Sequence, residues 1–178
     1  KILLENIGNI QSEKDDGGPF RLPVDRVFSI KGFGTVVTGT VVSGSIQVGD
    51  ELSIQPINER FKVRGLNTHN TSSNKISIGQ RAAINIQNID KSKIKRGFQV
   101  SSKDFFYGIS SIIANIEVLD SVVKPIKKNQ RIRIHLGTSE VIGKIIFFNQ
   151  KQIDPGQTSV VLICFESSIV ASYKDKFI

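Results

Sequence analysis

From Phe20 onward the sequence is a series of short β-forming segments separated by glycines, and this pattern restricts the fold more than any other feature. The segments RLPVDRVFSI, TVVTGTVVSG and SIQVGDELSI are rich in Val, Ile, Thr and Phe. Short strands at close spacing with glycine turns are typical of β-barrels and sandwiches. No long helical segment interrupts the strands, which argues against a parallel sheet with crossover helices. The sequence therefore predicts an all-β protein.

Two segments show the alternation expected of strands with one buried face. In RFKVRGL, Phe61 and Val63 face one side and Lys62 and Arg64 the other; in RAAINIQ, the residues Ala82, Ile84 and Ile86 oppose Arg81, Asn85 and Gln87. Side chains alternate between the two faces of a strand, so the apolar sets are predicted to lie in a core. A short helical or turn segment, DKSKIKR, and a last strand, GFQVSS, complete this region.

The order of the segments predicts two small antiparallel β-barrels. We place the first over residues 19–103 and the second over residues 104–178, where SIIANIEVL, RIRIHL, VIGKIIFF and TSVVLICFE are the main strands and SIVASY a further candidate. Apolar residues at helical spacing over residues 1–12 predict a short helix. The run Asp15–Pro19 ends it, so residues 1–18 read as a linker and a short N-terminal helical remnant of a domain cut off upstream.

Composition and charge narrow the function classes. The 178 residues carry a net charge of +8, of which +7 comes from residues 21–102. A basic region of this kind fits a polyanion such as nucleic acid, and fits a solvated surface equally well. No apolar run is long enough to cross a membrane. The single cysteine, Cys164, lies in an apolar run and is predicted to be an inert core thiol in a cytoplasmic protein.

The residues of catalytic and nucleotide-binding sites are missing from this sequence. Gly137 and Gly143 resemble the glycines of a phosphate-binding loop, but five residues separate them and Ile145 follows Lys144. A Walker loop needs four residues there and Ser or Thr after the lysine. With two histidines and one cysteine, neither a zinc site nor a nucleophilic triad can be assembled. We therefore expect a binding module without enzymatic activity, metal or cofactor.

One long ordered motif resembles a known family. The stretch Phe28–Gly39, FSIKGFGTVVTG, followed by Gly44 and Gly49-Asp50, is similar to the second domain of translational GTPases. Downstream, GQR at residues 79–81 and IKRG at residues 94–97 fall in the same order as in that family. Within the family, the cues PFR at 19–21, VDR at 24–26 and LGTSE at 136–140 are most similar to the selenocysteine-specific elongation factors. The resemblance is weaker over residues 111–178.

The resemblance implies domains II and III of a factor that carries selenocysteinyl-tRNA to the ribosome. It assigns the selenocysteinyl-binding residues to Asp25, Arg26 and Arg81. A selenol is more acidic than a thiol or hydroxyl, and arginine offers permanently charged, directed donors to the resulting anion. Neighbouring residues of one strand point to opposite faces, so Asp25 and Arg26 can share a pocket only at a strand end or a bulge. Arg81 is either a ligand contact or an ordinary surface arginine.

The basic residues are candidates for contacts with tRNA phosphates, which position an RNA without reading its sequence. They are Arg64, Lys91, Lys93, Lys95, Arg96, Lys124, Lys127, Lys128, Arg131 and Arg133. GTP and Mg²⁺ are expected only in a GTPase domain before residue 1, and binding of a selenocysteine-specifying mRNA element only in parts absent from this chain. The alternatives are domains II and III of a general elongation or initiation factor, or a stand-alone β-barrel interaction module.

Overall fold

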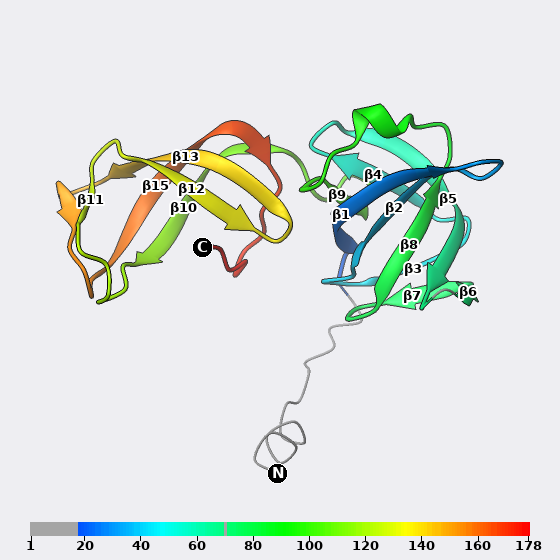
Figure 1. The fold of residues 1–178 in the computed structure, drawn as a ribbon, viewed down its shortest axis with the longest axis horizontal. Helices are drawn as coiled ribbons and strands as arrows, with labels where there is room; N and C mark the ends of the chain where they lie inside the picture. The colour runs from blue at the N-terminus through cyan, green and yellow to red at the C-terminus, as the bar shows by residue number, and fades with distance from the viewer. Residues whose placement is uncertain (1–17, 70) are drawn as a thin grey trace, which may run out of the picture.

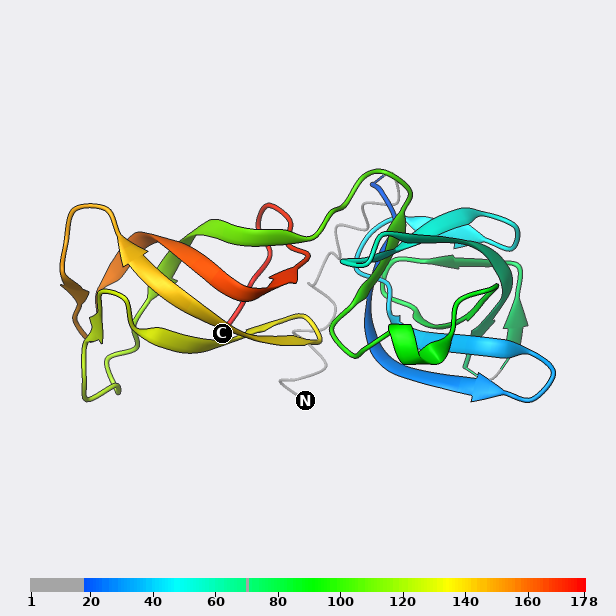
Figure 2. The same ribbon diagram turned by 90° about the horizontal axis from the view of Figure 1, so that it is seen from above.

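The computed structural model describes residues 18–69 and 71–178 as two β units lying side by side (Figures 1 and 2). A connector of residues 103–108 joins them. The helix predicted over residues 1–12 and the linker after it lie outside the described residues. Within these residues there is no α-helix, only the 3-10 helix η1 (Lys91–Lys93). The all-β prediction is confirmed, and η1 falls within the predicted short segment DKSKIKR.

The first unit is a closed six-stranded barrel. The strands of this unit, six of which form the barrel, are β1 (Arg21–Ile30), β2 (Gly34–Thr40), β3 (Ser45–Gln47), β4 (Glu51–Gln55), β5 (Glu59–Thr68), β6 (Thr71–Ser73), β7 (Lys75–Ser77), β8 (Arg81–Ile86) and β9 (Gln99–Ser102). The sheet order β4-β9-β1-β2-β8-β5 closes because β5 also pairs with β4. β6 extends β5, and β3 with β7 forms a separate two-stranded ladder. Closure leaves the six barrel strands without an open edge between them.

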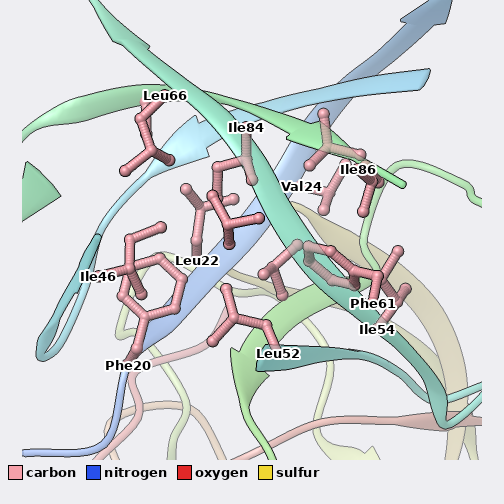
Figure 3. Close-up of a cluster of buried hydrophobic side chains, with 14 of the residues drawn as sticks. Phe20, Leu22, Val24, Ile46, Leu52, Ile54, Phe61, Leu66, Ile84 and Ile86 are labelled. Carbon is pink, nitrogen blue, oxygen red and sulfur yellow. The ribbon is translucent and has the colours of Figure 1, made fainter. Parts of the chain in front are cut away.

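The barrel interior contains the apolar side chains that the alternation predicted on β5 and β8, together with others from β1. Figure 3 shows Leu22, Val24, Ile84 and Ile86 pointing toward one another with Phe61. All five are at most 5% exposed, whereas Lys62 and Arg64 on β5 face solvent. Burial of apolar area at about 25 cal/mol per Å² makes this core the main source of stability. β1 is long enough to change partner, and its first three residues pair with β9 while the rest pairs with β2.

The second unit has its own core around a four-stranded antiparallel sheet in the order β10-β15-β13-β12. Its strands are β10 (Ile109–Glu117), β11 (Ile126–Lys127), β12 (Arg131–Leu136), β13 (Ser139–Phe147), β14 (Gln152–Ile153) and β15 (Thr158–Ile169). β11 and β14 pair at the end farthest from the first unit (Figures 1 and 2). The C-terminal segment returns along β12, where His135 and Ile178 exchange two backbone hydrogen bonds.

The structure corrects the last predicted strand, SIVASY, and shows where the strands end on either side of the predicted domain boundary. Of the candidate strand SIVASY, only Ser168 and Ile169 belong to a strand, because β15 ends there and the chain turns at residues 172–175. β9 ends at Ser102 and β10 begins at Ile109. The division into domains of residues 19–103 and 104–178 stays a prediction. None of the described helices is long and apolar enough to span a membrane.

Candidate functional site

A β-bulge in β1 creates the candidate site. Val24 pairs with Gly39 of β2, and Arg26 pairs with the preceding residue, Thr38, so Asp25 is the extra residue. A bulge of this kind bends its strand and redirects side chains. The condition under which Asp25 and Arg26 can share a surface, stated from the sequence, is therefore met by the backbone. Asp25 is partly buried, and Arg26 is exposed.

The Asp25 carboxylate is held by two side chains from neighbouring strands. The hydroxyl Oγ1 of Thr38 on β2 donates to Oδ1 at 2.6 Å. The guanidinium Nη1 of Arg81, at the start of β8, lies 2.6 Å from Oδ2. β2 and β8 are adjacent strands in which Thr40 pairs with Arg81, so the barrel itself brings the three residues together. The structure thus unites Asp25 with Arg81, which are 56 positions apart in the sequence.

The electrostatics of the site keep Asp25 ionised. Burial by itself raises the pKa of the Asp25 carboxyl, but the hydrogen bonds from Thr38 and Arg81 and the positive charges of Arg81 and Arg26 outweigh it. The pKa of Asp25 therefore lies below its ordinary value. A hydrogen bond to the charged form and a nearby cation both favour the carboxylate. At neutral pH the site holds one carboxylate and two guanidinium groups.

This arrangement can bind an anion. The side chain of Arg81 is 52% exposed although one of its nitrogens contacts Asp25, so the rest of its donor fork faces solvent. The carboxylate fixes the direction of that fork, which lowers the ordering cost when a ligand binds. Arg26, the residue after Asp25 on β1, adds a second positive charge that helps to lower the pKa of the Asp25 carboxyl. No group of three or more His, Cys, Asp or Glu side chains in the described residues could hold a metal ion.

Sequence reasoning missed two neighbours of the site. Thr38 donates the hydrogen bond to Asp25 described above. It lies opposite Arg26 in the β1–β2 hairpin, and pairing these two strands from the sequence could have identified it. Phe28 lies two residues after Arg26, on the same face of β1, and is 37% exposed. An exposed aromatic ring beside cationic groups can stack on a nucleobase or on a ligand.

The predicted phosphate contacts on the first unit lie near η1. Lys91, Lys93, Lys95 and Arg96 are all exposed, and Arg64 on β5 lines a shallow depression that extends to Asp90 at the start of η1. Lys93 Nζ donates to Glu59 at 2.7 Å, and this carboxylate raises the pKa of Lys93. Because its charge is already compensated, Lys93 has less to offer a phosphate than Lys91, Lys95 or Arg96.

The predicted phosphate contacts on the second unit fall into two groups. Arg131 donates twice to Glu166, at 2.7 and 2.9 Å, and Arg133 lies 3.3 Å from Glu140. Lys124, Lys127 and Lys128 lie in or beside β11, at the end away from the first unit. The structure therefore brings Asp25, Arg26 and Arg81 into one site, but it does not gather the ten basic residues into one patch.

Comparison with known proteins shows which class the first unit resembles. Residues 34–101 match the model of the elongation factor Tu domain 2 family, which covers β2 to β9 of the closed barrel. The first unit therefore has the fold of an elongation factor Tu domain 2 β-barrel, and the class of protein that it resembles is that of translation elongation factors.

Similarity over the whole chain is more specific. The chain is 35% identical over 159 residues to a selenocysteine-specific elongation factor of Desulfomicrobium baculatum, covering 89% of this chain and 25% of the relative. It is 31% identical over 177 residues to that of Haemophilus influenzae, covering 99% and 28%. A crystal structure of translation elongation factor SelB from Methanococcus maripaludis in the apo form superposes with a TM-score of 0.83 at 26% identity, covering 99% of this chain and 41% of that one. The chain resembles the selenocysteine-specific elongation factors, and the prediction of this relationship is confirmed. It spans about a quarter of the length of the two relatives.

Proposed function

We propose that this chain is the tRNA-binding part of a selenocysteine-specific elongation factor that delivers selenocysteinyl-tRNA to the ribosome. The observation that carries the proposal is the Asp25–Arg81 ion pair beside Arg26 at the β1 bulge. It occupies the positions that the family resemblance assigns to the selenocysteinyl group. Similarity to selenocysteine-specific factors over 89% of the chain supports the same reading.

The chemistry of discrimination follows from charge. A selenol is largely anionic at neutral pH, whereas a seryl hydroxyl is neutral. In our proposal the exposed donors of Arg81 and Arg26 hold the selenolate, and Asp25 orients Arg81 without taking the ligand's place. Charge-assisted hydrogen bonds are roughly twice as strong as neutral ones. A serine in the same position leaves the two guanidinium groups without their anion, which is a strong basis for rejection.

The tRNA body would be held by phosphate contacts. We propose that Arg64, Lys91, Lys95 and Arg96 contribute most on the first unit and Lys124, Lys127 and Lys128 on the second. Lys93, Arg131 and Arg133 already have carboxylate partners and release fewer counterions on binding. Contacts of this kind weaken as salt rises.

The remaining parts of the reaction belong to the longer protein. We propose that it is a cytoplasmic GTPase in which a separate domain binds GTP and Mg²⁺, and that this chain hydrolyses no GTP itself. Its further partners would be the ribosome, its own GTPase domain and, through other parts, a selenocysteine-specifying mRNA element.

The test compares two charged states of one tRNA. In the full-length protein with GTP bound, affinity is measured for selenocysteinyl-tRNA and for the same tRNA carrying serine, in wild type and in Arg81→Ala. A hydrogen bond to a charged group contributes about 1.5–3 kcal/mol, so the substitution should lower the affinity for selenocysteinyl-tRNA by roughly 10- to 150-fold. The affinity for the seryl form should change little.

The matched control is Arg60→Ala, which removes the same charge from an exposed arginine paired with Asp104 outside the site. It should leave the preference for selenocysteine intact. Equal affinities for the two charged tRNAs in the wild type would reject the proposed function. A preference that survives Arg81→Ala would keep the function and move the pocket elsewhere.

A further inference from the structure

Arg21, the first residue of β1, is a charged side chain that is almost entirely buried. Its side chain is 9% exposed, although arginine is rarely buried without a specific partner. Leu22 and Val24 on the same strand point into the barrel core. Arg21 and Pro23 therefore lie on the other face, which turns toward the second unit.

The guanidinium of Arg21 joins three separate parts of the chain. Its Nε donates to Oε1 of Gln99 on β9 at 2.7 Å. Its Nη1 donates to Oδ1 of Asp175 at 2.9 Å, and Nη2 donates to the other oxygen of the same carboxylate. The ring of Phe106, in the connector, lies 5.4 Å from the guanidinium carbon. Bidentate arginine–carboxylate pairs are strong and fix orientation as well as distance.

The partners of Arg21 are themselves held in place. Gln99, which is 2% exposed, donates from Nε2 to the backbone carbonyl of Val170 at 3.0 Å. Asp175 also accepts from the backbone N–H of Ser172 at 2.9 Å, so its carboxylate closes the turn that carries it. The network therefore runs from β1 and β9 of the first unit to residues 170–175 of the second.

The backbone around this network is closely packed. A Cβ on Gly97 would lie 2.8 Å from Cα of Ser139, and one on Gly108 would lie 2.7 Å from Cβ of Pro56. Real Cβ atoms do not approach other atoms this closely, so these glycines let the two units and the connector meet at short range. Arg21 is 9% and Asp175 23% exposed, and an ion pair with so little access to water stabilises a fold only when its geometry is good.

We propose that Arg21 is a positioning residue that holds the second unit in a fixed orientation on the first through Asp175 and Gln99. We call these three side chains and their hydrogen bonds the lock. Arg21 lies four residues before Asp25 on the same strand, so one strand carries both the lock and the candidate site. The lock fixes where the second unit's phosphate-binding residues stand relative to that site. This last consequence, for tRNA, rests on the proposed function; the lock itself does not.

The lock is tested by nuclear magnetic resonance on the 178-residue chain. Residual dipolar couplings of the two units should fit one alignment tensor in the wild type and require two in Asp175→Asn and Arg21→Met. The double variant R21D/D175R should restore a single tensor, because it exchanges the two charges of the pair. The side-chain amide of Gln99 accepts from Arg21 through Oε1 in the wild type and can donate through Nε2 to a carboxylate at position 21. Rescue by the exchanged pair is a result that simple loss of packing would not give.

Two features keep this experiment decisive. Asp104→Asn removes an exposed ion pair with Arg60 at the connector and should leave the single tensor unchanged. Asp175 lies outside the strands, so its variant stays informative even when Arg21→Met fails to fold. One shared tensor in Asp175→Asn, as in the wild type, would overturn the proposal.

The consequence for tRNA has a separate readout. In the full-length protein, Asp175→Asn should lower the affinity for selenocysteinyl-tRNA and for the seryl form by the same factor. We expect a factor of about five or more, because phosphate contacts made by the second unit would be lost. Arg81→Ala should instead change the ratio of the two affinities. No change in either affinity with Asp175→Asn would leave the lock without a role in tRNA binding. A wild type that does not discriminate would reject the proposed function and leave the result on the alignment tensors standing.

Discussion

Replacing Gly39 with alanine tests whether the β1 bulge depends on close contact between two strands. Gly39 lies opposite Val24, directly beside the extra residue Asp25. A Cβ at this position would lie 2.2 Å from the carbonyl oxygen of Pro23 and 2.6 Å from Cδ2 of Leu22. Since carbon–oxygen contacts begin at roughly 3.3 Å, the strands would have to separate by about 1 Å.

The size of the effect follows from what the new methyl group meets. Inserting a methyl group into a packed core costs about 1–3 kcal/mol, and more where the surroundings cannot yield. Here the nearest obstacle is a backbone oxygen in a closed barrel, so we expect a loss of about 3 kcal/mol. That is a large fraction of the roughly 5–15 kcal/mol by which a domain is stable. The same movement would displace Asp25 from Thr38 and Arg81.

The chain contains no tryptophan, so its unfolding in urea is followed by nuclear magnetic resonance instead of tryptophan fluorescence. The signals of residues in the first unit then give the loss of stability for that unit alone. Gly65→Ala is the matched control, because Gly65 lies in β5 at another register shift and its Cβ would meet Asn85 Cβ at 3.9 Å. We expect that variant to lie within about 1 kcal/mol of wild type. A Gly39→Ala protein as stable as Gly65→Ala would refute the reasoning.

Three further predictions concern single side chains. Asp25→Asn should lower the free energy of unfolding by about 1 kcal/mol at neutral pH. Because the pKa of Asp25 in the folded protein lies below the ordinary value of 3.8, the difference in stability between wild type and variant should shrink as the pH falls from 3.8 through that lower pKa. Equal differences at about pH 7 and pH 3 would contradict this prediction. Ile145→Ala, at a position with no exposed surface, should cost the second unit about 2–5 kcal/mol in urea unfolding and leave the first unit unchanged; loss of both together would show that they unfold as one. Lys93→Ala removes an exposed ion pair with Glu59 and should leave the midpoint of urea unfolding unchanged. A lower midpoint would mean that η1 depends on this pair.

The barrel core was predictable from the sequence because it depends on local alternation. Phe61 and Val63 in one strand and Ala82 and Ile84 in another are buried as their spacing indicates. The short strands β6, β7, β11 and β14 were not anticipated, since segments of two or three residues are too short to show alternation. Their existence depends on partners supplied by the fold.

The candidate site was predictable only in part. The resemblance supplied Asp25, Arg26 and Arg81, and strand geometry supplied the need for a bulge. The position of the bulge depends on the register between β1 and β2, which the sequence does not display. The pairing of Arg21 with Asp175 spans 154 residues and has no local signal at all.

The double pairing of β1 has a consequence for how the protein is made. Residues 21–23 of this strand find their partners in β9, about eighty residues later, and Arg21 finds Asp175 near the end of the chain. These contacts cannot form until β9 and then Asp175 have been synthesised, and topologies rich in such distant contacts fold slowly. Among the strands of the two units, β1 is therefore the first to be synthesised and one of the last to be fully paired.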